Sequence, residues 1–182
     1  MNDTINVVGL VGSLRRGSLN KALVRTASEV APEGMNITIF PLNEIPPYNF
    51  DVEQESGFPD SVIALREAVQ SADALVLATP EYNGSMSGVI KNAIDWASRG
   101  GLLAKKPVVT MAGSPGALGA TKAQEHLRQV CMHLGMYVLP RPTIAVPQFG
   151  NKIDNGIVTD EKTRGFIAQQ MSTFKDWIER LS

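Results

Sequence analysis

The chain has 182 residues, a length that suits one domain and is short for two. Hydrophobic residues make up 43% and charged residues 19%, which is the composition of a folded globular protein and not of a disordered one. Seventeen basic residues against 18 acidic ones leave a formal charge of -1, so no overall field favours nucleic acid or an anionic membrane. Any phosphate recognition must therefore be local.

A single cysteine, Cys131, excludes an internal disulfide, and no apolar run approaches the roughly 20 residues that span a bilayer. The first residues, Met1 to Thr4, have neither the basic nor the apolar region of a signal peptide. We therefore expect a cytoplasmic protein with no membrane span and no nucleic-acid partner.

The hydrophobic pattern alternates between strands and helices along the chain. Apolar runs predict five strands, at residues 5–11, 36–40, 74–79, 107–112 and 136–146. Apolar residues at helical spacing predict five helices, at residues 19–30, 61–72, 87–97, 121–134 and 167–181. Pro140 and Pro142 leave the register of the last strand open.

This alternation predicts a doubly wound α/β sandwich. The runs at 74–79 and 107–112 are apolar at almost every position, as expected of parallel strands that helices cover on both faces. We predict one domain over residues 1–182, with a five-stranded parallel sheet in the order 2-1-3-4-5 and helices on both faces. Ligands of such sheets bind beyond the carboxyl ends of the strands, so the loops after the first, third and fourth strands should meet there.

The first of these loops ends at the start of a helix, where about four backbone N–H groups lack partners and roughly half a positive charge favours phosphate. Ser13, Ser18 and Asn20 add side-chain donors, and Arg15 adds a cation. The candidate phosphate-binding residues are Ser13, Leu14, Arg15, Arg16, Gly17, Ser18, Leu19 and Asn20. The alternative is that Ser18 only caps the helix and that the arginines form a solvated face.

The same loop has neither the Gly-Lys-Ser/Thr end of a Walker A motif nor the Gly-x-Gly-x-x-Gly fingerprint of dinucleotide sites. A bound mononucleotide therefore fits better than tightly held NAD.

The second loop, after the strand at 74–79, combines turn residues with an aromatic. Its candidate ligand-binding residues are Pro80, Glu81, Tyr82, Asn83 and Gly84. A turn here would expose backbone N–H and C=O groups that suit the pyrimidine edge of a flavin, and Asn83 could help to read that edge. The alternative is a surface turn in which Tyr82 packs on its own helix.

The third loop, residues 112–120, is rich in glycine where backbone could approach a ligand, and its candidates are Ser114 and Gly116. Its N–H groups and the positive end of the next helix could stabilise the negative charge near N1 and O2 of a reduced flavin. The alternative is a flexible turn.

Other features favour structural roles. His126 and His133 lie two turns apart on one helix, about 10 Å of rise, whereas zinc–nitrogen bonds are about 2 Å, so we expect no metal site there. Cys131 falls on the apolar stripe of the same helix and is predicted to be a core thiol. The long connection at 41–59 is more typical of a binding or interface loop than of a linker.

The chain resembles the NADPH-dependent FMN reductase family, especially its bacterial quinone and chromate reductase branch, over nearly its whole length. The resemblance is carried by four segments: Gly12-Ser13-Leu14-Arg15 with Ser18 and Asn20; Pro80-Glu81-Tyr82-Asn83; Lys91-Asn92-Ala93-Ile94-Asp95-Trp96 with Ser98-Arg99; and His126-Leu127-Arg128. Two positions depart from the pattern. Ala120 stands where a second glycine is usual after Gly119, and Gly84 stands where an aromatic is frequent.

The resemblance implies a flavodoxin-like fold, an FMN phosphate held by residues 13–20, an isoalloxazine held by residues 81–84 and bordered by Ser114, and a homodimer or homotetramer. It implies hydride transfer from NADPH or NADH to FMN, and then two-electron transfer to a quinone or to a similar acceptor such as chromate, an azo dye or free flavin. Because the cofactor carries this reaction, we expect neither a catalytic side chain nor a metal.

Two other functions stay open. One is a flavodoxin-type electron carrier, a class whose strong acidity this nearly neutral chain lacks. The other is a flavin-binding sensor that uses the connection at 41–59 to contact a partner and that turns over little NAD(P)H.

Overall fold

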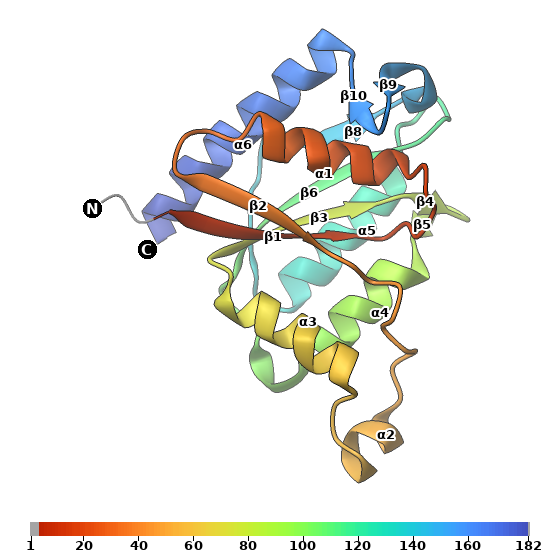
Figure 1. The fold of residues 1–182 in the computed structure, drawn as a ribbon, viewed down its shortest axis with the longest axis vertical. Helices are drawn as coiled ribbons and strands as arrows, with labels where there is room; N and C mark the ends of the chain where they lie inside the picture. The colour runs from red at the N-terminus through yellow and green to blue at the C-terminus, as the bar shows by residue number, and fades with distance from the viewer. Residues whose placement is uncertain (1–3, 182) are drawn as a thin grey trace.

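A computed structural model describes residues 4–181. The prediction that the chain begins without a signal peptide concerns residues 1–3 as well, and these lie outside the described part. A parallel sheet occupies the centre, with helices on both faces (Figure 1). Its strands are β1 (Ile5–Val11), β2 (Met35–Phe40), β3 (Ala74–Thr79), β6 (Pro107–Gly113), β7 (Tyr137–Val138) and β8 (Ile144–Val146). The order is β2-β1-β3-β6-β7, with β8 also pairing with β6, which confirms the predicted order 2-1-3-4-5.

The fifth strand of that prediction is divided into β7 and β8, which pair with opposite ends of β6. Pro140 and Pro142 lie between the two pieces, and proline has no N–H to donate to a ladder. Two buried glutamines bind carbonyl groups beside the interruption. Gln124 Nε2 donates to Ile144 O at 2.8 Å, and Gln170 Nε2 donates to Pro142 O at 2.7 Å. The interruption therefore keeps hydrogen-bond partners for its backbone.

Two helices cover one face of the sheet and three cover the other. The first face carries α1 (Leu19–Glu29) and α6 (Glu161–Leu181), and the second carries α3 (Asp60–Ser71), α4 (Gly88–Ala97) and α5 (Thr121–His133). All six residues of β3 are buried: Ala74, Val76 and Ala78 pack into the first core, and Leu75 and Leu77 into the second. The continuous apolar run of β3 thus reflects burial on both faces of the sheet, as predicted.

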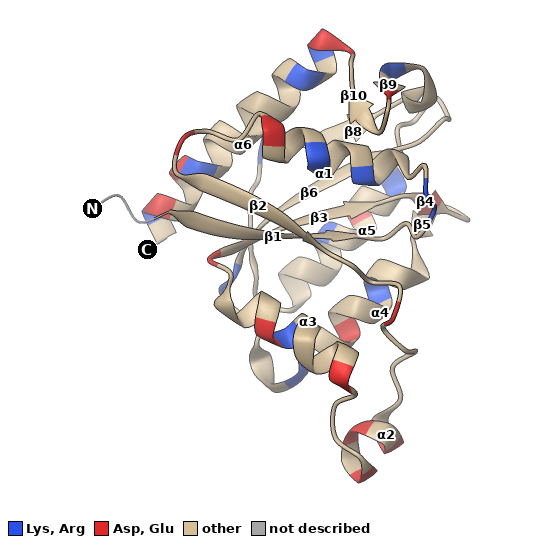
Figure 2. Cartoon of the chain, viewed as in Figure 1, with Lys and Arg blue, Asp and Glu red and all other residues tan. Residues whose placement is uncertain are grey.

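Several short elements were not predicted: α2 (Phe50–Glu55), the hairpin β4 (Glu81–Tyr82) and β5 (Ser85–Met86), the hairpin β9 (Ile153–Asp154) and β10 (Ile157–Val158), and the 3-10 turns η1 (Arg99–Gly101) and η2 (Phe149–Lys152). Helix α2 lies at the far end of the long connection, away from the sheet (Figure 1), and none of its residues is buried. Within residues 4–181, no helix has the length and apolar character needed to cross a membrane. Basic and acidic residues are interspersed over most helices in Figure 2, whereas the charged residues of α2 are all acidic.

The connection at 41–59 is fastened to α4 by side chains of the Lys91–Arg99 segment. Asn92 Nδ2 and Trp96 Nε1 both donate to Pro46 O at 2.8 Å, and Tyr48 N donates to Asn92 Oδ1 at 2.7 Å. The Tyr48 ring meets the Trp96 ring edge to face, with centroids 4.8 Å apart. These residues of the family segment therefore hold a loop, which the sequence alone does not show.

A carboxylate completes this attachment. Glu53 of α2 accepts a hydrogen bond from Tyr48 Oη at 2.8 Å and pairs with Arg99 Nε at 3.0 Å. Partial burial raises the pKa of Glu53, but the hydrogen bonds from Tyr48 and Arg99 outweigh it, so the pKa lies below its ordinary value. The same contacts raise the pKa of Arg99. The charged pair thus ties α2 to the end of α4.

Candidate functional site

The structure brings the three predicted loops together at the carboxyl ends of β1, β3 and β6. They line one small pocket of about 80 Å³. Its residues are Ser13, Arg15, Ser18, Leu19 and Asn20 from the first loop, Pro80, Glu81 and Tyr82 from the second, and Gly113, Ser114 and Pro115 from the third. Segments more than 30 residues apart in the sequence thus share one cavity.

The other candidate residues lie around this pocket and do not line it. Arg16, Gly17 and Gly116 are exposed, and Asn83 and Gly84 form the tip of the second loop. Leu14 is 55% exposed and lines a separate hollow with Leu42, Ile45 and Val89, among others. The first loop therefore presents Ser13 and Arg15 to the shared pocket and Leu14 to its other side.

Two buried side chains connect the loops beneath the pocket. Asn20 Nδ2 donates to Gly113 O at 3.0 Å, and Gly113 N donates to Asn20 Oδ1 at 3.0 Å. Ser87 Oγ donates to Gly12 O at 2.6 Å. Asn20 was predicted as a phosphate donor, but this exchange occupies its oxygen and one N–H, which leaves one N–H for a ligand. We did not predict from the sequence that Asn20 connects the first and third loops.

A sequence signal for that role exists. Asn20, Leu23 and Ala27 follow the spacing of the buried face of α1, and all three are buried. A polar side chain on a core-facing stripe needs a hydrogen-bond partner inside the protein. The spacing therefore indicates that Asn20 bonds to another buried segment, although it does not identify Gly113.

Ser18 is the N-cap of α1, since its Oγ accepts a hydrogen bond from Lys21 N at 3.1 Å. Ser18 therefore does cap the helix, and whether it also binds phosphate stays a prediction. The cap does not conflict with phosphate binding, because a hydroxyl that accepts through oxygen can still donate its hydrogen. Arg15 is exposed beside it and makes no ion pair with the residues of the described chain.

The second loop is a tight β-hairpin, β4–β5, and not an irregular turn. Asn83 and Gly84 both have positive φ, at 51° and 74°, as a two-residue type I′ turn requires. Asn-Gly is the strongest short signal for such a hairpin, so the sequence contained this information. The hairpin leaves Tyr82 49% exposed, which places an aromatic ring at the mouth of the pocket and argues against its packing on the following helix.

The hairpin is docked on α5 by one side chain from each strand. Glu81 Oε2 accepts a hydrogen bond from Ala123 N, in the first turn of α5, at 3.3 Å, and Ser85 Oγ lies 2.9 Å from His126 Nδ1. A carboxylate at this helix end offsets the positive end of the helix dipole. Glu81 thus occupies one N–H at the end of α5, and the stabilisation of a reduced flavin by this helix end stays a prediction.

The third loop is hydrogen-bonded to the end of β8 and to the segment after it, so it is not the free turn of the alternative reading. Ser114 N donates to Val146 O at 3.1 Å, Phe149 N to Ser114 O at 2.9 Å, and Gln148 N to Gly116 O at 3.1 Å. A Cβ at Gly113 would lie 2.9 Å from Phe149 Cε1 and closer still to Cδ1. Only glycine allows this approach without displacing the ring.

The groups set aside in the sequence are placed accordingly. Cys131 is fully buried, and burial raises the pKa of its thiol to about 12, so it is a protonated core residue as predicted. His126 contacts Ser85, and His133 lies at the far end of α5. Among residues 4–181 no cluster of three or more His, Cys, Asp or Glu side chains could hold a metal ion.

Comparison with known proteins assigns the family. Residues 5–151 match the family model for NADPH-dependent FMN reductase. The chain belongs to this family. It is 43% identical to an NAD(P)H-dependent FMN reductase of Pseudomonas aeruginosa and 41% identical to a quinone reductase of Escherichia coli, each over 100% of this chain and 99% of the relative. FerB from Paracoccus denitrificans, a flavoenzyme NAD(P)H:(acceptor) oxidoreductase, superposes with a TM-score of 0.87 at 36% identity, over 96% of this chain and 97% of that one.

Since the chain belongs to the FMN reductase family, we ask whether the pocket and the surface around it can hold FMN. A pocket of about 80 Å³ is well below the roughly 300–1,000 Å³ that encloses a drug-sized ligand, so it has room for a phosphate and not for a flavin ring. The ring would have to lie on the adjoining open surface, where Tyr82, Asn83 and Gly116 are exposed. The residues present therefore fit FMN with its phosphate in the pocket and its ring on the adjoining surface.

Ala120, where the resemblance leads us to expect a glycine, keeps a backbone conformation typical of glycine. Ala120 has φ 66° and ψ 34°, in the left-handed region that favours glycine. Its methyl group is buried with Ala112 and Ala123. The backbone of the third loop thus keeps the glycine conformation although the residue is alanine.

Proposed function

We propose that this protein is an FMN-dependent NAD(P)H oxidoreductase that reduces quinones. The observation that carries the proposal is the pocket shared by three loops at the amino end of α1, in a chain of the NADPH-dependent FMN reductase family. The quinone reductase of Escherichia coli, at 41% identity over the full chain, supports a quinone as the acceptor.

The phosphate of FMN would be held in the first loop. Ser13 and Ser18 supply hydroxyl donors, the unpaired N–H groups at the amino end of α1 add to them, and Arg15 supplies a cation. Leu14, Arg16, Gly17, Leu19 and Asn20 complete this segment. Ser18 is buried and fixed by its cap hydrogen bond, so its hydroxyl is held in place before any ligand arrives.

The isoalloxazine would be held between the second and third loops by Pro80, Glu81, Tyr82, Asn83, Gly84, Ser114 and Gly116. The type I′ turn and the docking of Glu81 on α5 fix the hairpin backbone, whose N–H and C=O groups suit the pyrimidine edge. The side chain of Glu81 is directed to Ala123, so we assign contact with the ring to the backbone of residues 81–84.

Bound FMN supplies the redox chemistry, since it can accept two electrons and a proton as hydride from NAD(P)H and pass two electrons to a quinone. The chain positions the partners and leaves one side open. Tyr82, at 49% exposure, borders that opening and offers a ring against which a planar substrate can pack. The pocket holds one acidic side chain, Glu81, and its contact with α5 makes it a positioning group.

The finer predictions remain open to experiment. A homodimer or homotetramer and a cytoplasmic location stay predictions, as do chromate, azo dyes and free flavin as further acceptors and the choice between NADPH and NADH.

The test is a turnover assay on purified protein loaded with FMN. NADPH and NADH oxidation is followed with and without benzoquinone. We expect oxidation that depends on benzoquinone, with the parallel double-reciprocal lines of a ping-pong mechanism. Flavin that is bound but not reduced by either nucleotide would overturn the proposal in favour of an electron carrier. Stoichiometric reduction with negligible turnover would overturn it in favour of a sensor.

A further inference from the structure

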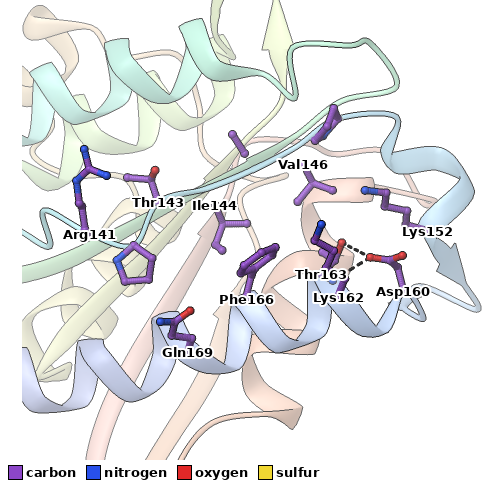
Figure 3. A pocket seen from close by; sticks show the side chains of 13 residues that line it. Arg141, Thr143, Ile144, Val146, Lys152, Asp160, Lys162, Thr163, Phe166 and Gln169 are labelled. Carbon is purple, nitrogen blue, oxygen red and sulfur yellow. Dashed lines mark hydrogen bonds between the residues drawn. The ribbon is translucent and has the colours of Figure 1, made fainter.

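A hollow separate from the candidate flavin pocket lies between β8 and α6 (Figure 3). Its volume is about 590 Å³, which falls in the range of pockets that hold small organic ligands. No residue lines both this hollow and the flavin pocket. We call it the β8–α6 pocket. Its lining residues are Arg141, Pro142, Thr143, Ile144, Ala145, Val146, Pro147, Lys152, Asp160, Lys162, Thr163, Phe166 and Gln169.

Two regular elements form its walls. One wall is the consecutive segment 141–147, which contains β8. The other is one face of α6, where Thr163, Phe166 and Gln169 recur every three residues. Figure 3 shows the Phe166 ring projecting from α6 toward the strand. Phe166 is 50% exposed, so a large aromatic surface remains in this hollow for a ligand to cover.

The charge of the pocket is positive although the chain is slightly acidic. Arg141, Lys152 and Lys162 line it against a single acid, Asp160. Asp160 accepts hydrogen bonds from Thr163 N at 2.8 Å and from Thr163 Oγ1 at 2.6 Å, which lower its pKa, with smaller effects from the two lysines. None of the three cations takes part in an ion pair within the described residues. Their charge is therefore available to an anion.

The edge of β8 adds backbone groups. Val146 O accepts a hydrogen bond from Ser114 N, so the backbone N–H and C=O of Val146 point toward β6. Successive residues of a parallel strand direct their N–H and C=O groups to opposite sides. Ala145 therefore directs its N–H and C=O away from β6, on the free edge that forms the pocket wall. These groups can orient a ligand that the apolar walls and the cations attract.

We propose that the β8–α6 pocket is a second binding site, for a small organic anion that combines an aromatic body with a phosphate or carboxylate group. The apolar walls and Phe166 cover the body, and Lys152, Lys162 and Arg141 neutralise the charge. This proposal does not depend on the proposed redox function, because the two pockets share no lining residue.

The probe is 1-naphthyl phosphate, titrated by calorimetry into protein saturated with FMN so that the flavin phosphate site is filled. We expect one saturable site per chain, with affinity that falls as salt rises, since the cations lie near the surface. Inorganic phosphate and 1-naphthol each represent one half of the probe and should bind at least tenfold more weakly, because each lacks one of the two recognised parts.

Variants locate the site. The double variant Lys152→Gln, Lys162→Gln and the single variant Phe166→Ala should each weaken the probe at least tenfold. Lys175→Gln is the matched control, since it removes a charge from the same helix outside the pocket and should change affinity less than twofold. Phe166 and Lys162 are exposed and Lys152 is partly exposed, so these variants should fold, which thermal unfolding checks.

Three results would overturn the proposal. The first is the absence of saturable binding of 1-naphthyl phosphate, and the second is equal binding in all variants. The third is binding that competes with benzoquinone in the turnover assay and is not weakened by the substitutions. The last would place the probe over the flavin.

Discussion

Asn20 and Gly113 lie 93 residues apart in the chain and exchange two hydrogen bonds of 3.0 Å each. The amide of Asn20 pairs with the N–H and C=O of Gly113 much as a neighbouring strand would. This pair ties the start of α1 to the end of β6, and thus the first loop of the candidate site to the third.

Asn20→Ala should separate these loops. It leaves a buried N–H and a buried C=O of Gly113 without partners, so the free energy of unfolding should fall by roughly 1–3 kcal/mol. FMN affinity should fall as well, because the phosphate and ring segments lose their connection. Urea unfolding and flavin titration measure the two effects. Asn43→Ala, an exposed asparagine elsewhere, should stay within about 0.5 kcal/mol of the parent. Unchanged FMN affinity in Asn20→Ala would contradict the account.

Ser18→Asp separates the two roles of Ser18. Aspartate caps helices as well as serine does, so the stability should change by less than about 0.5 kcal/mol. Its carboxylate removes the hydroxyl donor and repels a phosphate, so FMN affinity should fall at least tenfold. Asn49→Asp likewise puts an aspartate at an N-cap, that of α2, far from the pocket, and should leave FMN affinity unaltered. Equal FMN binding by both variants would show that Ser18 is only a cap.

Gly113→Ala should destabilise the protein by about 1–3 kcal/mol, because the new methyl group overlaps the buried Phe149 ring. In a Phe149→Ala background the same substitution should have little effect, since the ring is gone. Chemical denaturation of the four proteins gives the coupling between the sites. Gly165→Ala is the control: it lies exposed inside α6 with no atom near the added Cβ, and should stabilise by roughly 0.5–1 kcal/mol. Additive effects at 113 and 149 would refute the packing explanation.

Acid should release the connection at 41–59. The pKa of Glu53 is lowered by Tyr48 and Arg99, so its contribution is complete above the ordinary value of 4.5 and is lost as the pH falls through the lower value of the folded protein. Limited digestion with pepsin should therefore cut within 46–58 faster as the pH falls below about 4.5. At each acid pH above the folded-state pKa of Glu53, Glu53→Gln should be cut faster than the parent, whereas Asp51→Asn on the same helix should behave like the parent. A ratio of variant to parent cleavage rates that does not change with pH would exclude this role for Glu53.

Much of the fold follows from local pattern. The uninterrupted apolar run of β3 and the helical spacing of α1 determine their type of structure because burial on two faces, or on one, leaves its period in the sequence. The type I′ turn at Asn83 and Gly84 was also encoded locally and was overlooked. The division of the last strand was indicated by Pro140 and Pro142. The hydrogen bonds from Gln124 and Gln170 to carbonyl groups beside the division were not, because these glutamines lie on other elements, distant in the chain.

The site shows the same limit. The positions of the three loops could be predicted because strand order determines which loops meet. The contacts of Asn20 with Gly113, and of Glu81 with α5, could not, because they depend on side-chain directions across the packed structure. The dependence of the 41–59 connection on Trp96 and Arg99 is likewise a tertiary fact. The sequence of residues 91–99 shows only an amphipathic helix and does not reveal that Trp96 and Arg99 contact this connection.

The central claim is that residues 13–20, 80–84 and 113–116 grip one flavin mononucleotide at one edge of the sheet. Titration of FMN into flavin-free protein, followed by flavin fluorescence, tests it most directly. The account predicts saturation at one FMN per chain, with an affinity at least tenfold lower in Ser18→Asp and unaltered in Asn49→Asp. Protein that remains without flavin in excess FMN, or that binds it equally in both variants, would contradict the account.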